Sequence, residues 1–295
     1  MKPARVLLLG AHGMLGQALV RRFSWEPGCV LLTAARRQAD FCFDFTDDAS
    51  LARAFRTARP DVVINAAAIT SLAAAEREPG LAYRVNARLA GVLAELCRKT
   101  DARLVQVSTD HYYVGDGAAL HDESAPVVLL NEYARTKYAG EAFALAQPGN
   151  LVLRTNIVGF RHQAGRPTFV EWALGEAQAG RQMHLFDDFY TSSMTVRQFA
   201  DIFVRVLDAG LTGRYNLAAR HAVTKETFVV ALSEQLLGKR PAYVRASLHE
   251  MAAGVERADS LGLDTQKIEA ALGIPMPELP DVITSLKEEW KEHAV

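Results

Sequence analysis

Short apolar runs alternate with segments of helical periodicity through the first half of the chain, and this alternation limits the fold more than any other feature. We predict strands over the runs at 6–9, 30–34, 61–65, 104–107 and 151–153. Apolar residues between them recur at helical spacing, which predicts helices over 14–23, 48–58, 83–99 and 133–146. Strands separated by helices pair in parallel through right-handed crossovers. The sequence therefore predicts an α/β fold with a doubly wound parallel sheet.

The second half of the chain has a looser pattern. We predict helices over 169–179, 196–207, 225–237 and 281–292, with short strands at 183–186 and 215–217. The predicted boundaries are a sheet domain over 1–155, to which segments near 190–220 return, and a smaller mixed α/β lobe over 156–295. A chain of 295 residues is long enough for two such lobes.

Charge and cysteine content exclude several classes of protein. The 33 Lys and Arg residues balance 34 Asp and Glu residues, which argues against nucleic acid as the main partner. No stretch approaches the ~20 apolar residues that span a bilayer, so we expect no membrane partner. The 3 cysteines form no CxxC pair, and His184 and His221 stand alone without ligand spacing, so we expect neither disulfides nor a metal site. A cytoplasmic globular protein fits these features.

A glycine-rich loop follows the first predicted strand and opens the first predicted helix. It reads Gly10-Ala11-His12-Gly13-Met14-Leu15-Gly16. Glycines here let the backbone turn tightly and approach a pyrophosphate, whose charge then lies on the unpaired amides of the helix N-terminus. The flanking strand and helix favour a Rossmann-type dinucleotide site over a plain glycine-rich turn. The predicted cofactor contacts in this loop are Gly10, His12, Gly13, Met14, Leu15 and Gly16, with His12 a loop residue rather than a catalytic one.

The end of the second strand selects between NAD and NADP. An acidic side chain there would hold a ribose hydroxyl, and a basic one would hold a 2′-phosphate. The strand ends in Ala34-Ala35-Arg36-Arg37, and two guanidinium groups suit a phosphate. We therefore predict NADPH as cofactor, with NADH as the second choice and two solvated arginines as the alternative interpretation. Asp44 and Phe45 would bracket the adenine.

A tyrosine and a lysine lie four residues apart at the start of the helix over 133–146. This spacing places Tyr133 and Lys137 on one helix face. A phenol has an ordinary pKa near ~10, and an adjacent ammonium favours its anion, which brings proton transfer into range near neutral pH. Thr109, just after the strand over 104–107, would bond the same substrate oxygen. We predict these three as catalytic residues that reduce a ketone, with hydride from a nicotinamide and the proton from Tyr133.

Several motifs together resemble the extended short-chain dehydrogenases/reductases, and within these the chain is most similar to the dTDP-4-dehydrorhamnose reductase family. The motifs are Gly10 to Gly16, Asn65-Ala66-Ala67-Ala68, Ser108-Thr109-Asp110, Tyr133 to Lys137 with Gly140-Glu141, Arg154-Thr155 and Leu263-Asp264-Thr265-Gln266-Lys267. The resemblance covers nearly the whole chain. It implies that 1–155 binds NADP, that 156–295 binds substrate, and that the protein reduces the 4-keto group of a nucleotide-linked 6-deoxy sugar with NADPH or NADH.

The resemblance also assigns roles to single residues. It implies the catalytic roles of Thr109, Tyr133 and Lys137, and a supporting position behind the site for Asn86. Cofactor contacts are implied for Asn65, Ala66, Ala67, Ala68, Ser108, Tyr133 and Lys137, and substrate contacts for Thr70, Asp110 and Asn156. A homodimer is compatible with it.

A charged loop follows the strand over 151–153. Arg161, His162 and Arg166 would meet the diphosphate of a sugar nucleotide, and Phe160 or Phe169 would stack on its base. A mobile charged surface loop is an equally weighted alternative. The family pattern is also broken at His111-Tyr112-Tyr113-Val114-Gly115 and at Tyr190-Thr191-Ser192-Ser193. Because such loops shape a sugar pocket, the sequence predicts neither the sugar nor the nucleotide.

Two other functions stay open at this point. One is a nucleotide-sugar 4-epimerase or dehydratase, which keeps its NAD(P) bound and recycles it. The other is a nonenzymatic subunit that binds NADP and regulates a partner. The presence of Thr109, Tyr133 and Lys137 favours catalysis, because binding alone has no need of the phenol.

Overall fold

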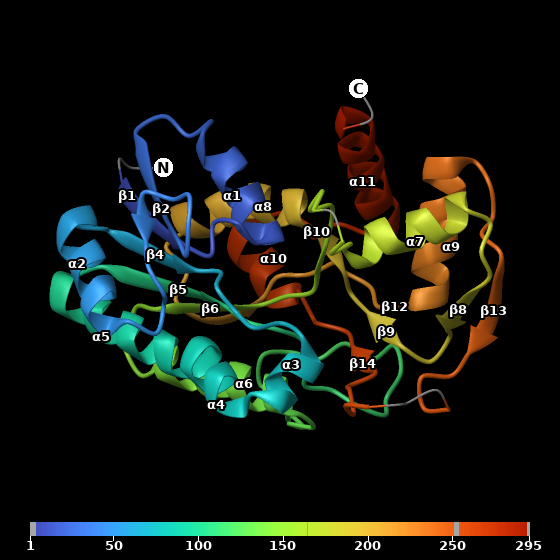
Figure 1. The fold of residues 1–295 in the computed structure, drawn as a ribbon, viewed down its shortest axis with the longest axis horizontal. Helices are drawn as coiled ribbons and strands as arrows, with labels where there is room; N and C mark the ends of the chain where they lie inside the picture. The colour runs from blue at the N-terminus through green and yellow to red at the C-terminus, as the bar shows by residue number, and fades with distance from the viewer. Residues whose placement is uncertain (1–3, 164, 251–253, 294–295) are drawn as a thin grey trace. The chain divides into compact units, whose positions relative to one another are not determined.

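The computed structural model describes residues 4–163, 165–250 and 254–293. Within them a seven-stranded sheet has the order β11-β6-β5-β4-β1-β2-β3, and the strands from β1 to β6 pair in parallel. The strands are β1 (Ala4–Leu9), β2 (Cys29–Ala35), β3 (Phe41–Cys42), β4 (Val62–Asn65), β5 (Arg103–Val107), β6 (Leu151–Arg154) and β11 (Gly213–Asn216). From β1 the order runs outward through β2 and β3 on one side. On the other side it runs through β4, β5 and β6 (Figure 1). The prediction of a doubly wound parallel sheet is confirmed.

Helices cover both faces of this sheet (Figure 1). They are α1 (Met14–Phe23), α2 (Asp48–Ala58), α3 (Leu72–Arg77), α4 (Pro79–Ala82), the π-helix η1 (Tyr83–Arg88), α5 (Leu89–Thr100), α6 (Glu132–Leu145) and α8 (Val196–Asp208). Alternate side chains of a strand point to opposite faces. Leu7 and Leu9 of β1 therefore join one buried cluster with Phe55 of α2, Leu93 of α5 and Ala144 of α6. On the other face α1 meets α8, where the ring centroids of Phe23 and Phe203 lie 6.4 Å apart.

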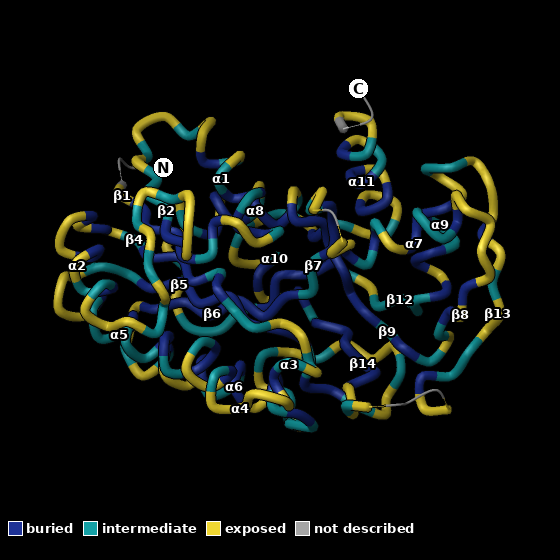
Figure 2. The backbone as a smooth tube through the Cα atoms, viewed as in Figure 1, coloured by how far each residue is buried: buried dark blue, intermediate teal, exposed yellow. Residues whose placement is uncertain are grey.

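Burial of the sheet explains why its strands read as continuous apolar runs. Val6, Leu7, Leu8 and Leu9 have no exposed surface, and Figure 2 shows the central strands as buried along their length. Each such side chain stabilises the fold by roughly 1.5–3 kcal/mol relative to an exposed position. A strand covered on both faces cannot alternate apolar with polar residues.

The chain divides into two compact units. The first contains the described residues up to Thr109 together with 129–154 and 200–215, and the second contains 110–128, 155–199 and 216 onward. The elements of the second unit are β7 (Ile157–Val158), α7 (Phe169–Gln178), β8 (Met183–Phe186), β9 (Tyr190–Thr191), β10 (Met194–Thr195), β12 (Val223–Thr224), α9 (Lys225–Leu237), β13 (Tyr243–Ala246), β14 (Ser260–Leu261), α10 (Gln266–Leu272) and α11 (Leu279–His293). Small sheets pair β10 with β7, β12 and β14 with β9, and β13 with β8.

The second unit has its own apolar core. Val170 and Leu174 of α7, Phe228 and Leu232 of α9 and Leu286 of α11 are buried together. The N-terminus of α7 carries a capping box, in which Thr168 and Glu171 each accept a backbone N–H of the other's segment. No helix among the described residues has both the length and the apolar character needed to cross a bilayer.

Several local predictions differ from the structure, and two of the differences have a clear physical reason. The helix predicted over 83–99 begins as the π-helix η1 and becomes α-helical only at Leu89. The strand β13 was not predicted, because Tyr243, Val244 and Arg245 offer too short a pattern to distinguish a strand from a loop. By contrast, the helix predicted over 14–23 coincides with α1 at both ends.

Candidate active site

The register of the large sheet brings the predicted cofactor segments of the first unit to one edge. Leu9 of β1 pairs with Ala34 of β2 and with Asn65 of β4, and Asn65 pairs with Gln106 of β5. The segments that follow these four residues therefore begin side by side. They are the glycine loop, Arg36 and Arg37, Ala66 to Thr70, and Ser108 with Thr109.

The glycine loop packs too tightly for side chains at two positions. Gly10 has a φ of +87°, and a Cβ there would lie 2.8 Å from the backbone of Ala66 and Ala67. A Cβ on Gly16 would lie 2.2 Å from the carbonyl oxygen of Gly10. Only glycine relieves both conflicts, because it has no Cβ and tolerates positive φ.

The start of α1 has the donor arrangement that binds an anion. Gly13 is its N-cap and supplies no side-chain cap, so the first-turn amides of Met14, Leu15 and Gly16 are left to an external acceptor. His12 is exposed, and its Nε2 donates to Arg37 O at 2.8 Å, which ties the loop to the end of β2. This backbone fits the pyrophosphate of a dinucleotide.

Arg36 and Arg37 are both exposed just after β2. The pKa of Asp44 lies below its ordinary value, chiefly because the hydroxyl and the backbone amide of Thr46 both donate to its carboxylate. The charges of Arg36 and Arg84 act in the same direction, so Arg36 lies near this carboxylate. Phe45 is half-buried, with its ring edge-to-face against Phe43 at 5.5 Å. The basic pair is thus accessible beside the residues predicted to bracket adenine.

Asn65 holds the segment that follows β4. Its Oδ1 accepts from Ala67 N at 3.2 Å and its Nδ2 donates to Gln106 Oε1 at 2.8 Å. Ala66 N donates to Leu9 O at 3.1 Å. Ala66 and Ala68 remain partly accessible beside buried Ala67, and Thr70 at the end of this segment is exposed.

Tyr133 lies in the first turn of α6. The N-cap Asn131 accepts from Ala134 N through its side chain, which fixes where the helix begins. Tyr133 is 8% exposed and packs against Ala75 and Ala82, with Leu72 beside them. The phenol is therefore held by α3 and α4 rather than displayed on the surface.

Lys137 lies one turn after Tyr133 and reaches the end of β5. Its Nζ donates to Val107 O at 2.6 Å, and the residue is 4% exposed. Burial lowers the pKa of Lys137 to about 8, although the charge of Glu141 acts in the opposite direction. Since Ser108 and Thr109 follow Val107 directly, this hydrogen bond joins the Tyr-Lys helix to the strand that carries Thr109, which is itself buried.

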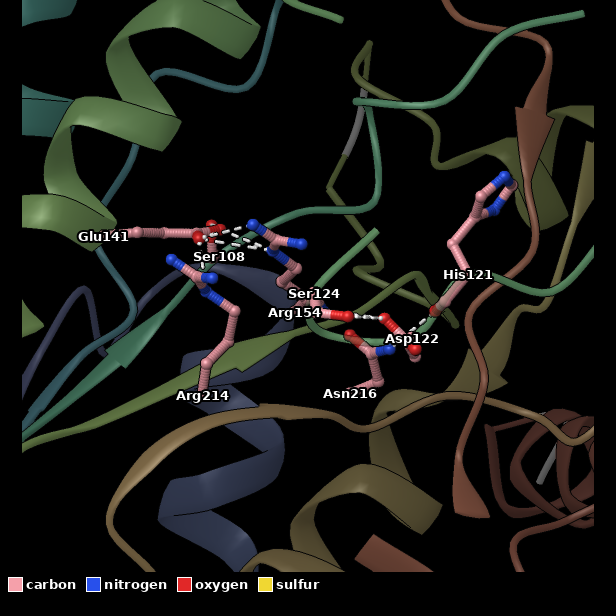
Figure 3. A network of polar contacts seen from close by, with 8 residues as sticks. All are labelled: Ser108, His121, Asp122, Ser124, Glu141, Arg154, Arg214 and Asn216. Atoms are coloured by element: carbon pink, nitrogen blue, oxygen red, sulfur yellow. Dashed lines mark hydrogen bonds and ion pairs between the residues drawn. The ribbon is translucent and has the colours of Figure 1, made fainter. Parts of the chain in front are cut away.

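Glu141, one turn further along α6, sits in a buried ion cluster (Figure 3). Ser108 Oγ donates to Glu141 Oε1 at 2.6 Å, Arg154 Nη2 lies 2.9 Å from Glu141 Oε2, and Arg214 Nε lies 3.0 Å from the same oxygen. Glu141 has no exposed surface. The Ser108 hydroxyl thus supports this cluster. Glu141 was named from the sequence only within the Gly140-Glu141 motif and was assigned no role, because a Glu on a helix is expected to be solvated unless its arginine partners on other strands are known.

Asn86 supports the site from the π-helix η1. Its side chain bonds Ile69 on both backbone groups and donates to Thr136 Oγ1 at 3.1 Å. Gly140 of α6 approaches the same turn so closely that a Cβ would lie 2.3 Å from Asn86 O. The π-turn and the missing Cβ together allow α6 to pack closely against η1. Such π-turns are frequent at functional sites.

The predicted substrate residues of the second unit fall into two groups. Asp110 is buried and accepts from Asn156 Nδ2 at 2.5 Å, so the structure brings these two together. In the loop after β7, Arg161 N and His162 N donate to Glu171 Oε1 at 2.8 and 2.6 Å, whereas Arg166 is exposed.

Lys225, which was not predicted, joins the first of these groups to Phe169. Its Nζ lies 4.6 Å from the centre of the Phe169 ring. The charge of Asp110 raises the pKa of Lys225, against the larger effect of burial, which lowers it. No sequence signal pointed to it, since it opens α9 with an ordinary capping residue before it. Across the described ranges, no three His, Cys, Asp or Glu side chains gather as a metal site would require.

Comparison with known proteins gives one consistent result. The family model described as RmlD substrate binding domain matches residues 4–291. A dTDP-4-dehydrorhamnose reductase of Mycobacterium tuberculosis is 35% identical over 227 residues, which are 74% of this chain and 71% of that protein. A probable low-salt glycan biosynthesis reductase of Haloferax volcanii is 27% identical over 97% of this chain and 98% of that protein.

A solved structure shares the fold. It is the dTDP-4-dehydrorhamnose reductase of Bacillus anthracis in complex with NADP, with a TM-score of 0.87 and 23% identity over 98% of this chain and 100% of that chain.

Proposed function

Because the chain belongs to the RmlD substrate binding domain family, we propose that it is an NADPH-dependent reductase of the 4-keto group of a nucleotide-linked 6-deoxy sugar. The observation that carries the proposal is the pair of buried residues one turn apart on α6, Tyr133 and Lys137, with Lys137 bonded to the strand end that continues into Thr109. A binding protein has no use for this arrangement. The relatives named as dTDP-4-dehydrorhamnose reductases support the same reaction.

The residues present fit the nicotinamide dinucleotide that the family implies. The first-turn amides of α1 would hold its pyrophosphate, and the backbone of Ala66 to Ala68 would line its path along the sheet edge. When bound, the reduced cofactor supplies the hydride for the carbonyl carbon. The NADP in the Bacillus anthracis structure supports this choice of cofactor.

The chain itself supplies the proton and holds the carbonyl. Thr109 donates a hydrogen bond to the carbonyl oxygen, which positions it for the Tyr133 hydroxyl. Tyr133 then donates its proton as negative charge grows on that oxygen. The Lys137 ammonium, fixed by Val107 O, stabilises the phenolate that remains.

The test is NADPH oxidation by the purified protein with dTDP-4-dehydrorhamnose and other nucleotide-linked 4-keto-6-deoxy sugars. We expect turnover with one oxidised cofactor formed for each keto group reduced. Protein that retains NAD(P) through purification and interconverts sugars without net oxidation would instead be an epimerase or dehydratase. Binding of NADPH without turnover of any such sugar would leave the regulatory function.

The basic pair after β2 predicts the cofactor preference. Replacing Arg36 and Arg37 with Ala should raise the dissociation constant for NADPH by roughly 10- to 100-fold, because charge-assisted hydrogen bonds to the 2′-phosphate are lost. The dissociation constant for NADH should change little. Both are measured by fluorescence titration, with Arg56→Ala, an exposed arginine on α2, as the matched control. Equal losses for the two cofactors would remove the 2′-phosphate role.

Lys137 predicts the alkaline limb of the pH profile. Its pKa of about 8 means that the ammonium loses its proton as pH rises above that value. We expect kcat/KM for sugar reduction to fall above pH 8, by about tenfold per pH unit once the lysine is largely neutral. In Lys137→Arg the guanidinium stays charged, so whatever activity remains should lack this limb. If that variant binds NADPH and keeps the same limb, another group is responsible.

We further propose the cytoplasm as the compartment. Cys29, Cys42 and Cys97 are free thiols in the structure, which suits a reducing compartment. Sedimentation of the purified protein tests the homodimer that the sequence left open.

A further inference from the structure

Lys225 occupies an unfavourable position for a lysine. It is the first residue of α9, where the helix dipole presents partial positive charge. The side chain is half-buried, and its backbone N–H donates to Phe189 O at 3.0 Å, which fixes the helix start against that residue. Burial lowers the pKa of Lys225 to about 8, and only the carboxylate of Asp110 opposes this effect. A cation held at such a place is a candidate for binding a ligand.

The Lys225 ammonium is enclosed but poorly hydrogen-bonded. Its Nζ lies 4.6 Å from the centre of the Phe169 ring and 5.3 Å from that of Phe189. Among the described residues, it donates to Thr191 Oγ1 alone, at a long 3.4 Å. The two rings shield the ammonium from water. Because an ammonium has three N–H donors, it can still donate to a ligand.

A chain of polar side chains runs from Lys225 to Asp110. Ser193 Oγ lies 3.1 Å from Thr191 Oγ1 and donates to Asn156 Oδ1 at 2.6 Å. Asn156 Nδ2 in turn donates to Asp110 Oδ2 at 2.5 Å. Asp110, Thr191 and Ser193 are all buried. We call Lys225, Thr191, Ser193, Asn156 and Asp110 the Lys225 cluster; all five belong to the second unit.

The charge of the Lys225 cluster decides what it binds. Lys225 and Asp110 carry opposite charges. Burial, followed by the charges of Lys225 and Arg257, lowers the pKa of neighbouring His111 to about 4, so that side chain stays neutral. A carboxylate or phosphate on Lys225 would also face the charge of Asp110. A sugar hydroxyl avoids this conflict, because it accepts from an ammonium and donates to a carboxylate.

We propose that the Lys225 cluster is a sugar subsite, in which Lys225 donates to one ring hydroxyl of the substrate and Asp110 accepts from its neighbour. Lys225 is then a specificity-determining residue that reads adjacent hydroxyls of the sugar. This assignment rests on the proposed function, which supplies the nucleotide-linked sugar. Asp110 is the residue that follows Thr109 in the chain.

The experiment measures how much the sugar adds to binding. Dissociation constants for dTDP and for dTDP-rhamnose, the reduction product of dTDP-4-dehydrorhamnose, are determined calorimetrically for the wild type, Lys225→Met and the exposed control Lys291→Met. We expect Lys225→Met to raise the dissociation constant for dTDP-rhamnose by roughly 10- to 100-fold, the range for loss of a hydrogen bond to a charged group. The dissociation constants for dTDP and NADPH should not change. The KM for the keto sugar should rise far more than kcat falls.

Other results would overturn the assignment. If Lys225→Met weakens dTDP itself by the same factor, the ammonium holds the diphosphate and not the sugar. If the variant keeps the wild-type difference between dTDP-rhamnose and dTDP, Lys225 does not contact the sugar. Failure of the proposed function looks different, since the wild type would then bind both ligands equally and oxidise no NADPH with the keto sugar.

A second measurement needs no variant. The wild type should bind the 2-deoxy or the 3-deoxy analogue of dTDP-rhamnose at least roughly tenfold more weakly than dTDP-rhamnose, because one partner of the Lys225 and Asp110 pair is lost. Equal affinity for both analogues and the parent would exclude the hydroxyl pair even if Lys225→Met does not fold.

Discussion

Tyr133→Phe should lower kcat for NADPH-dependent sugar reduction by roughly 10²-fold or more, the scale expected when a general acid is lost. The substitution removes one oxygen and keeps the ring that packs against Ala75 and Ala82. The fold and the dissociation constant for NADPH should therefore stay close to those of the wild type. Steady-state rates and fluorescence titration of NADPH measure the two quantities.

Tyr138→Phe is the matched control for this substitution. Tyr138 lies on the same helix, is half-buried, and has no role in the proposed proton transfer. It should leave kcat within about twofold of the wild type, as expected for a change outside the reacting groups. Near-normal turnover of Tyr133→Phe would remove that residue from the reaction, whatever the control shows.

Glu141→Gln should produce the largest loss of stability, about 3–5 kcal/mol in the free energy of unfolding. The substitution leaves the guanidinium of Arg154, 1% exposed, and that of Arg214 without their buried counter-charge. The Ser108 hydroxyl also loses its charged carboxylate acceptor, and the neutral amide oxygen of Gln replaces that acceptor only in part. Urea denaturation followed by circular dichroism gives the value.

Glu95→Gln provides the comparison on the neighbouring helix. Glu95 pairs with Arg98 and Lys99 on the exposed face of α5, where water screens the charges. Its urea midpoint should stay at the wild-type value. A Glu141→Gln variant as stable as Glu95→Gln would mean that the buried cluster adds nothing to stability.

The first unit was largely predictable because its signals are local. Residues 6–9 and 14–23 carry strand and helix periodicity within single segments, and the parallel order follows from the handedness of the crossovers. The π-helix η1 was not predictable in this way. Its geometry depends on the close approach of Gly140 to Asn86 O, and these two residues are more than fifty positions apart in the chain. The periodicity within 83–99 carries no signal of this contact.

The site shows the same limit. Tyr133 and Lys137 have a recognisable spacing, and in the structure both are buried on successive turns of α6. The hydrogen bond of Lys137 to Val107 O, the burial of Glu141 and the enclosure of Lys225 by two rings all depend on tertiary contacts. Nothing in the sequence around Lys225 separates it from a solvated lysine at a helix start.

The contact of Gly140 with Asn86 O has a consequence for redesign. A helix advances about 1.5 Å and turns about 100° per residue, so α6 cannot slide or rotate to absorb a side chain at 140 without moving Tyr133 and Lys137 by a comparable amount. The catalytic helix is thus a fixed part of the scaffold. Efforts to change the accepted sugar therefore belong at side chains outside α6, such as Thr191, Ser193 and Lys225 of the proposed sugar subsite.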